Sequence, residues 1–216
     1  MVTFTLNGWS RLKVSCWEDK WHHLSYEISI MASRFIKTLL LPVALLMVAC
    51  SKSEERFSTT YPCHLVFDTS LYRADCKLTQ CLSNPGMFVM VKKSVGANGA
   101  YALELAANDG EPVQKVYATT EKQKAGIGTL GASDCIIVGC TNFNGLVAFD
   151  RQCPKCVEEK GAASYPLEFQ DRGQTLKCSS CGASYGLQYD GGGDNGYTLY
   201  RYKVRWDGMV LSISNQ

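Results

Sequence analysis

Two pairs of cysteines place four thiols at metal-ligand spacing. Cys153 and Cys156 form one Cys-x-x-Cys pair, Cys178 and Cys181 form another, and 21 residues separate the pairs. A Cys-x-x-Cys segment folds into a tight turn that aims two sulfurs at one point, so two such turns complete a tetrahedron. Four thiolates suit zinc, a single iron or an iron–sulfur cluster. Disulfides are the alternative in an exported protein, and the paired spacing favours a metal.

Seven further cysteines bring the total to 11. Cys135 and Cys140 flank an apolar run with four residues between them, and Cys76 and Cys81 have the same spacing. In an oxidising compartment we expect these four thiols to form structural disulfides, although the spacing does not fix which pairs with which.

An apolar segment near the start of the chain indicates export. Arg34 and Lys37 precede the apolar run Thr38–Ala49, which has the length of a signal-peptide core. It is shorter than the roughly 20 apolar residues that a membrane span needs. The run ends in the letters MVAC, which resemble a bacterial lipobox with Met47 in place of the usual leucine. The resemblance implies cleavage before Cys50 and lipidation of its thiol; an uncleaved anchor is the alternative.

The domain organisation follows from that segment. Met31 is a natural start, so we interpret residues 1–30 as a mis-assigned upstream extension and residues 31–49 as a lipoprotein signal peptide. Residues 50–60 form a polar tether, and residues 61–216 form one domain of ordinary size. A lipid anchor would place the chain in the cell envelope, at the outer membrane, on its periplasmic or surface face.

The pattern after the tether is typical of an all-β domain. Short apolar runs alternate with turn signals such as "NPG", "NDG" and "NFNG", and apolar residues at helix spacing are scarce. We expect the Gly-rich segment Glu121–Ser133 to form a loop or a short helix. The predicted strands are His64–Thr69, Met87–Lys92, Ala100–Leu105, Val113–Ala118, Cys135–Val138, Gly145–Phe149, Tyr165–Phe169, Gln174–Lys177, Ser184–Tyr189, Tyr197–Val204 and Met209–Ile213.

The segment from Asp150 resembles a Rieske domain. In "DRQCPKC" and "LKCSSCGASYGLQYDGG", Cys153 and Pro154 match the family's first cysteine and its proline. Cys178 matches the second cysteine, Gly182 the glycine after the second histidine, and Tyr185 the aromatic position. The resemblance implies a Rieske-like β-sandwich or barrel with two cysteine-bearing hairpin loops that bind a [2Fe–2S] cluster.

The departures from the family pattern change the expected centre. Lys155 stands at the first histidine position, where its neighbour Cys156 offers a thiol, and Cys181 replaces the second histidine. A cluster would therefore have four cysteine ligands, and a single zinc or iron ion is nearly as well supported. Ala183 replaces a serine that bonds a cluster sulfide in high-potential members. We also expect Tyr185 and the two serines between the last cysteine pair, Ser179 and Ser180, to surround the ligands.

Charge and motifs limit the function. From Cys50 onward the chain has 17 basic and 17 acidic residues and no basic block, which excludes the footprint of a nucleic-acid binder. The first hypothesis is an envelope electron-transfer protein with an unidentified redox partner. The alternative is a non-redox lipoprotein, stapled by zinc or disulfides, that binds another envelope component. Both describe a carrier or binding protein rather than a catalyst. Asp190 and Asp194 fit a glycine turn better than a calcium loop.

Overall fold

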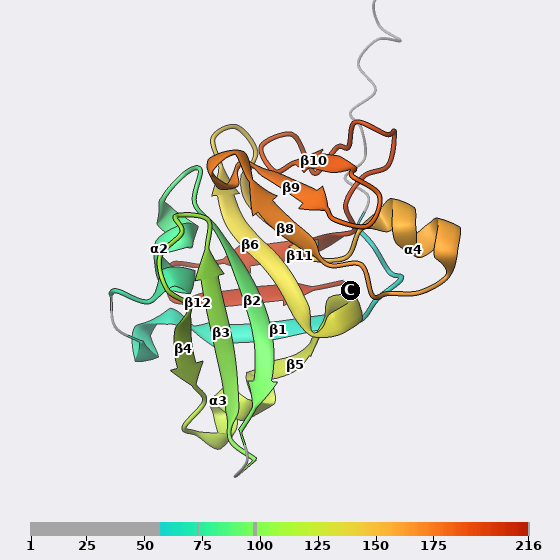
Figure 1. Ribbon diagram of the computed structural model, residues 1–216. Helices are drawn as coiled ribbons and strands as arrows, with labels where there is room; N and C mark the ends of the chain where they lie inside the picture. Colours follow the sequence, from blue (N-terminus) through green and yellow to red (C-terminus); the bar gives the residue numbers. More distant parts are fainter. Residues whose placement is uncertain (1–56, 73, 97–98, 216) are drawn as a thin grey trace, which may run out of the picture. The chain divides into compact units, whose positions relative to one another are not determined.

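The computed structural model describes residues 57–72, 74–96 and 99–215. Within them the chain forms twelve strands, three α-helices and three short 3-10 helices (Figure 1). The helices are α2 (Lys77–Ser83), α3 (Glu121–Gly126), α4 (Pro154–Lys160), η1 (Thr69–Leu71), η2 (Gly131–Ser133) and η3 (Asp171–Gly173). The strands are β1 (Cys63–Asp68), β2 (Phe88–Val95), β3 (Tyr101–Ala107), β4 (Gln114–Tyr117), β5 (Ile127–Leu130), β6 (Cys135–Thr141), β7 (Gly145–Asp150), β8 (Leu167–Gln170), β9 (Thr175–Cys178), β10 (Ser184–Gly186), β11 (Arg201–Trp206) and β12 (Val210–Ser214).

Nine of these strands form one antiparallel sheet in the order β4-β3-β2-β6-β7-β11-β12-β1-β5. The sheet curls into a half-barrel, so that β1, β11 and β12 cross behind β2 and β6 (Figure 1). Its concave side holds a large core. The main members of this core are Leu65, Val91, Leu103, Leu105, Ile136, Tyr202, Leu211 and Ile213, all fully buried.

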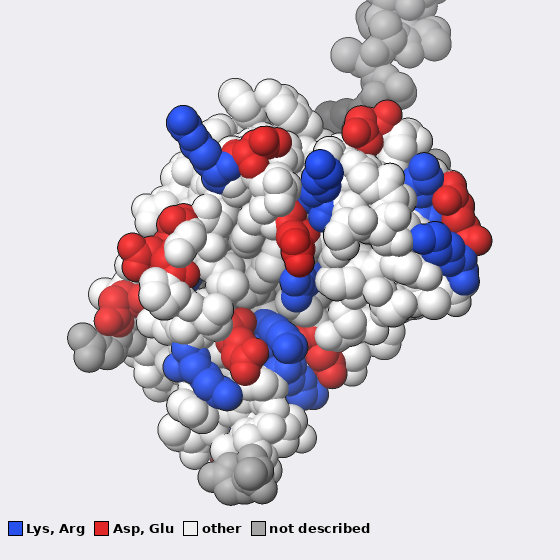
Figure 2. All heavy atoms as spheres, viewed as in Figure 1, with Lys and Arg blue, Asp and Glu red and all other residues white. Residues whose placement is uncertain are grey.

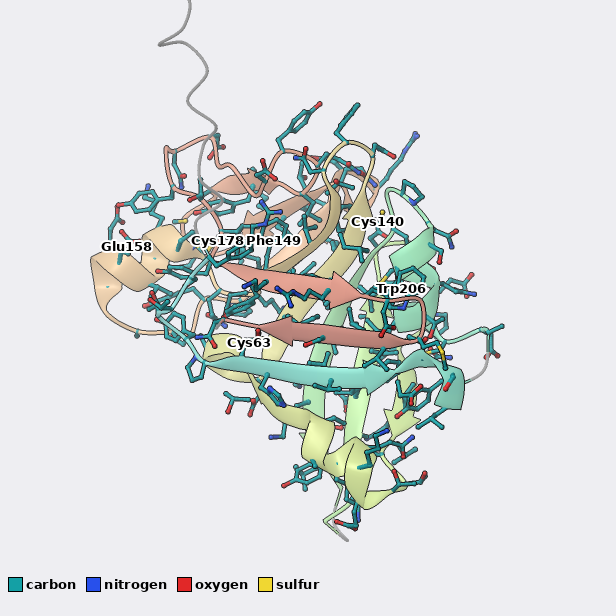
Figure 3. The ribbon with its side chains drawn as sticks, turned by 180° about the vertical axis from the view of Figure 1, so that it is seen from behind. Cys63, Cys140, Phe149, Glu158, Cys178 and Trp206 are labelled. Carbon is teal, nitrogen blue, oxygen red and sulfur yellow. The ribbon has the colours of Figure 1, made fainter. Side chains whose placement is uncertain are left out.

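The other three strands form a small sheet in the order β10-β9-β8. It covers the outer face of the half-barrel and encloses a second core, here called the cysteine core. Its main members are Phe88, Ile137, Phe149, Leu167, Leu176 and Tyr185, together with Cys153, Cys156 and Cys178. Phe149 and Cys178 belong to this core, whereas Cys63 and Trp206 belong to or pack against the large one, and all four are labelled in Figure 3. The domain therefore has two cores separated by one sheet.

The central strands of the large sheet are covered on both faces, and this explains why their sequences do not alternate between apolar and polar residues. In β2, Val89 and Val91 face the large core while Phe88 and Met90 face the cysteine core. Successive residues of a strand point to opposite faces, so a strand covered on both sides reads as a continuous apolar run. This arrangement accounts for the letters "FVMV" in β2.

The strand predictions are confirmed in class and mostly in place, because eleven of the twelve strands overlap a predicted one. The strand β5 was not predicted. The segment 121–133 contains α3, β5 and η2 in succession, and Thr120 begins α3 with a reciprocal capping box to Gln123. The helices α2 and α4 were also missed, because each has only seven residues and shows too few turns for a periodic pattern.

Surface charges are mixed. On the face shown in Figure 2, positive and negative side chains are interleaved. Glu104, for example, lies between Lys92 and Lys115, with N···O distances of 3.9 and 3.5 Å.

The predicted upstream extension, the signal peptide and the lipidation site Cys50 lie outside the described residues. The last residues of the predicted tether are described, and they contact the domain: the Ser58 amide donates to the Arg201 carbonyl at 2.7 Å. None of the helices in the described ranges has the length and apolar character of a membrane span.

Candidate metal centre

The first cysteine pair lies where β7 leads into α4. Cys153 is the N-cap residue of that helix, Pro154 occupies its first turn, and Cys156 is its third residue. Proline suits this position because its fixed φ matches the helix and its missing N–H has no partner to lose there. The first pair thus begins a short helix inside the loop that joins β7 to β8, and the two ends of this loop pair antiparallel at Gln152 and Pro166.

The second pair lies in the hairpin turn between β9 and β10. Cys178 ends β9, and its amide donates to the Ala183 carbonyl at 2.9 Å. The Gly182 amide donates to the Cys178 carbonyl at 2.9 Å, and the φ angle of Gly182 is 74°. Few side chains tolerate that left-handed conformation, so the glycine allows the chain to turn sharply and leaves Cys181 at the tip. Here the predicted cysteine-bearing hairpin loop is confirmed.

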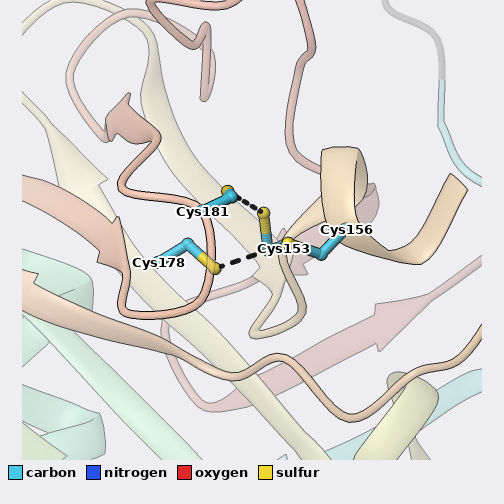
Figure 4. Close-up of side chains that lie close together, drawn as sticks. All are labelled: Cys153, Cys156, Cys178 and Cys181. Carbon is cyan, nitrogen blue, oxygen red and sulfur yellow. Dashed lines mark hydrogen bonds between the residues drawn. The ribbon is translucent and has the colours of Figure 1, made fainter. Parts of the chain in front are cut away.

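The two pairs meet, as Figure 4 shows. The Sγ atoms of Cys153 and Cys181 are 3.7 Å apart, and those of Cys156 and Cys178 are 3.8 Å apart. All four sulfurs lie within 4.8 Å of one another. Because zinc–sulfur bonds are about 2.3 Å long, a tetrahedral site requires sulfurs about 3.8 Å apart. The four predicted ligands are therefore close enough together to hold a metal ion.

The four cysteines differ in their exposure to solvent. Cys153, Cys156 and Cys178 are fully buried, while Cys181 is partly exposed. Burial raises the pKa of the Cys156 thiol to about 12 and also raises that of Cys153. Burial raises the pKa of Cys181 too, but hydrogen bonds from the Ala183 amide and the neighbouring thiols outweigh it and lower that pKa overall. Among Cys153, Cys156 and Cys181, the Cys181 thiol therefore loses its proton most readily in the metal-free site.

The predicted surrounding residues have different positions. The Tyr185 hydroxyl lies 3.4 Å from the Cys153 sulfur, and its ring is fully buried. Ala183 is buried beside the second turn. Ser179 and Ser180 are exposed, and the Ser180 hydroxyl accepts a hydrogen bond from Lys160 at 2.8 Å. The structure therefore brings Tyr185 to a ligand, whereas Ser180 bonds to a lysine instead.

Sequence reasoning missed a polar brace at the first pair. The buried Gln152 side chain donates to Ser133 at 2.6 Å and accepts from the Tyr165 amide at 2.7 Å. The backbone amide of Gln152 donates to the carboxylate of buried Asp150 at 2.8 Å. These bonds fix the segment that leads into Cys153. The available signal was a polar stretch, "DRQ", between a buried strand and a cysteine.

The nine cysteines of the described ranges are not joined in disulfides, and the geometry bears on two of the pairings that the sequence left open. Cys135 and Cys140 lie at opposite ends of a strand, about 17 Å apart at the usual rise per residue. Cys76 is the N-cap of α2 and Cys81 is its fifth residue, so five steps of the usual helical rise separate them by about 7.5 Å along the axis alone. Disulfides require Cα atoms within about 7 Å, so neither of these two pairs can close, and pairing of the four cysteines with other partners stays a prediction.

The aspartates of the Gly-rich loop do not converge, in agreement with the glycine-turn interpretation. Asp190 accepts from Asn144 and Arg201, whereas Asp194 accepts from the Ser184 amide. Among the described residues, the four cysteines are the one cluster with metal-ligand geometry.

Comparisons with protein-family models, curated proteins and solved structures found no match for this chain. The resemblance to Rieske domains therefore rests on the residues quoted above, and the chemistry of the site rests on its own geometry.

Proposed function

We propose that Cys153, Cys156, Cys178 and Cys181 bind one zinc ion, and that this ion staples the small sheet to the half-barrel. The spacing of the four sulfurs carries the proposal. The two distances across the pairs, 3.7 and 3.8 Å, match the edge of a tetrahedron around a single ion.

A [2Fe–2S] cluster fits this spacing less well. Two thiolates would bind each iron, and the two irons with their bridging sulfides would stand between the two pairs. Thiolates on different irons would then lie farther apart than a tetrahedral edge. The compact arrangement, with all sulfurs within 4.8 Å, favours one ion over two.

The position of the site supports a stapling role. Cys153 and Cys156 lie at the start of α4, which directly follows β7 of the half-barrel, whereas Cys178 and Cys181 lie at the end of β9 and in the turn that follows it in the small sheet. The small sheet has strands of only four, four and three residues. Such a sheet gains much of its stability from what it packs against, and a closed four-thiolate zinc site contributes folding free energy directly. The resulting module would act by binding another component of the envelope.

A second candidate function is electron transfer with iron in the same site. Two observations favour it: Cys181 is partly exposed, and the Tyr185 hydroxyl lies 3.4 Å from the Cys153 sulfur. An exposed ligand gives an electron a short path to a partner, and a hydrogen bond to a ligand sulfur tunes the potential of an iron centre. Its partner would be a redox protein of the same compartment.

The deciding experiment is metal analysis of the full chain purified under air and under anaerobic conditions. We expect one zinc per chain, no visible absorption and no acid-labile sulfide. The Cys156→Ser variant should lose the metal, while the Cys140→Ser variant should retain it because Cys140 lies outside the cluster.

Three results would overturn the zinc proposal. Iron and sulfide in equal amounts, with broad visible absorption, would show a cluster. A metal-free chain with its thiols oxidised would show that the cysteines form disulfides. One iron per chain without sulfide would keep the single-ion geometry and favour electron transfer over stapling.

A further inference from the structure

A glycine-rich loop folds back over the residue that contacts the first ligand. Residues 190–196 follow β10, and Gly193 forms a β-bridge with Tyr185. The Asp194 amide donates to the Ser184 carbonyl at 3.2 Å, and the Ser184 amide donates to the Asp194 carboxylate at 3.3 Å. These bonds hold the loop against the strand that carries Tyr185, on the side of the small sheet where its hydroxyl lies.

The orientation of the Asn195 side chain follows from its neighbours. Its Oδ1 atom accepts from the Tyr197 amide at 3.0 Å, and a backbone amide can only donate. The other end of the amide group, Nδ2, must therefore face Tyr185, whose hydroxyl oxygen lies 3.2 Å away. Because an amide NH₂ is a donor, the Tyr185 oxygen accepts this bond.

The direction of the next bond is then fixed. The Tyr185 oxygen accepts from Asn195, so its own proton is available to the Cys153 sulfur at 3.4 Å. A metal-bound thiolate has no proton and can only accept. Three hydrogen bonds thus run in one direction, from the Tyr197 amide through Asn195 and Tyr185 to Cys153. Bonds aligned in this way polarise and strengthen one another.

Gly193 makes the close approach of the loop possible. A Cβ atom at this position would lie 2.7 Å from Cε1 of the Tyr185 ring and 2.7 Å from Oδ1 of Asn195. Both distances are shorter than van der Waals contact, so any larger residue would push apart the two side chains that the chain of bonds requires.

We propose that Asn195 is a positioning residue for the metal centre: its side chain keeps the Tyr185 hydroxyl donating to the Cys153 thiolate. The inference rests on the proposed function, because it needs a metal-bound thiolate. Ordering Tyr185 in this way withdraws electron density from one ligand sulfur and fixes the orientation of that ligand. Loss of an outer hydrogen-bond partner typically lowers metal affinity by about 10- to 100-fold.

The test uses cobalt in place of zinc in the full chain, because thiolate-to-cobalt charge-transfer bands report on the ligand sulfurs. Tyr185→Phe removes the donor to Cys153. Asn195→Asp keeps the acceptor for the Tyr197 amide but replaces the donor that faces Tyr185 with a second acceptor. The tyrosine proton should then turn toward the carboxylate and leave the sulfur.

We expect both variants to shift the charge-transfer bands to lower energy and to weaken cobalt affinity by about 10-fold. Introduced into the Tyr185→Phe background, Asn195→Asp should have little further effect on either quantity, because it acts through the missing hydroxyl. The Asn144→Ala control removes a 3.0 Å bond to Asp190 in the same loop and should leave both quantities unchanged.

The inference is overturned if Asn195→Asp changes neither quantity, or if it changes both equally with and without the Tyr185 hydroxyl. The second result would show that the added charge or a general loosening of the loop is responsible. Either failure differs from failure of the proposed function, which would appear as a parent chain that binds no cobalt at four thiolates.

Discussion

The two cores of this domain are built in different ways. The large core contains more than twenty buried residues, most of them from the strands of one continuous sheet and several from α2. The cysteine core lies between that sheet and three strands of four, four and three residues. Backbone hydrogen bonds hold the first region together. The second region is joined to the first by side-chain packing, the four thiols and a few hydrogen bonds, which include the backbone bonds beside the isolated bridge between Gln152 and Pro166.

A bound metal should contribute most to stability in the region with the less extensive backbone pairing. A long sheet closed on its own apolar interior can be stable alone, whereas a short three-stranded sheet depends on what it packs against. The four cysteines occupy the region that has the weaker support of its own.

Removal of the metal should have the largest effect, and it should be confined to one region. In the Cys156→Ser variant, or after chelation, we expect β8, β9 and β10 to lose amide hydrogen-exchange protection while β2 and β3 keep theirs. Zinc binding contributes roughly 10–16 kcal/mol to folding in zinc-finger peptides, so its loss can unfold a small unit completely. Simultaneous loss of protection in both sheets would show a single cooperative unit instead.

Matched leucine truncations test the same division without touching a ligand. Leu65 lies in the large core and Leu176 in the cysteine core, and both are fully buried. Leu65→Ala should lower the free energy of global unfolding by about 2–5 kcal/mol and leave metal affinity unchanged. Leu176→Ala should lower metal affinity and the protection of the small sheet. Denaturant titrations and chelator competition measure the two quantities, and identical results for both variants would contradict the contrast.

A polar bond inside the large core gives a smaller effect. The Tyr202 hydroxyl donates to the fully buried Asp150 carboxylate at 2.7 Å. Hydrogen bonds to charged groups contribute about 1.5–3 kcal/mol, so Tyr202→Phe should destabilise the domain by that amount in urea unfolding. Tyr189→Phe, at a side chain that is 75% exposed, is the control and should change stability by less than about 0.5 kcal/mol. Equal effects of the two changes would show that the buried bond contributes nothing.

The sequence was sufficient for the fold class and for the convergence of the four cysteines, and the reason is physical. Strands such as β2 and β6 bury both faces, so their apolar runs stand out between turn residues. Cys-x-x-Cys spacing predicts convergence because the local turn alone aims two sulfurs at one point. These signals are local and need no knowledge of the tertiary structure.

The features that the sequence did not predict depend on contacts across the chain. Asp150, Gln152 and Asn195 look like ordinary polar residues until the fold brings Tyr202, Ser133 and Tyr185 against them. A strand holds Cys135 apart from Cys140, and a helix holds Cys76 apart from Cys81, so equal spacing alone does not predict a disulfide within either pair. Spacing predicts a site where the backbone turns and misleads where it runs straight.

The smallest expected effect concerns two aspartates with opposite pKa shifts. Burial raises the pKa of Asp150 above its ordinary value, although hydrogen bonds from Tyr202, Ala132 and Gln152 oppose the rise. At the exposed β11–β12 turn, the amides of Val210 and Met209 lower the pKa of Asp207. The two carboxyls thus report on a desolvated and a solvated environment in one protein.

The signs of the linked stability changes must differ. The folded state holds the Asp150 proton more tightly than the unfolded state, so the contribution of this carboxyl falls as the pH rises from its ordinary value through its folded pKa. Asp207 behaves conversely: its contribution is present above the ordinary value and is lost as the pH falls through its folded pKa. Carboxyl carbon NMR titration of the metal-loaded protein should show Asp150 protonating at higher pH than Asp207. The reverse order would mean that hydrogen bonds outweigh desolvation at Asp150, and that the large core tolerates a buried charge better than its apolar packing indicates.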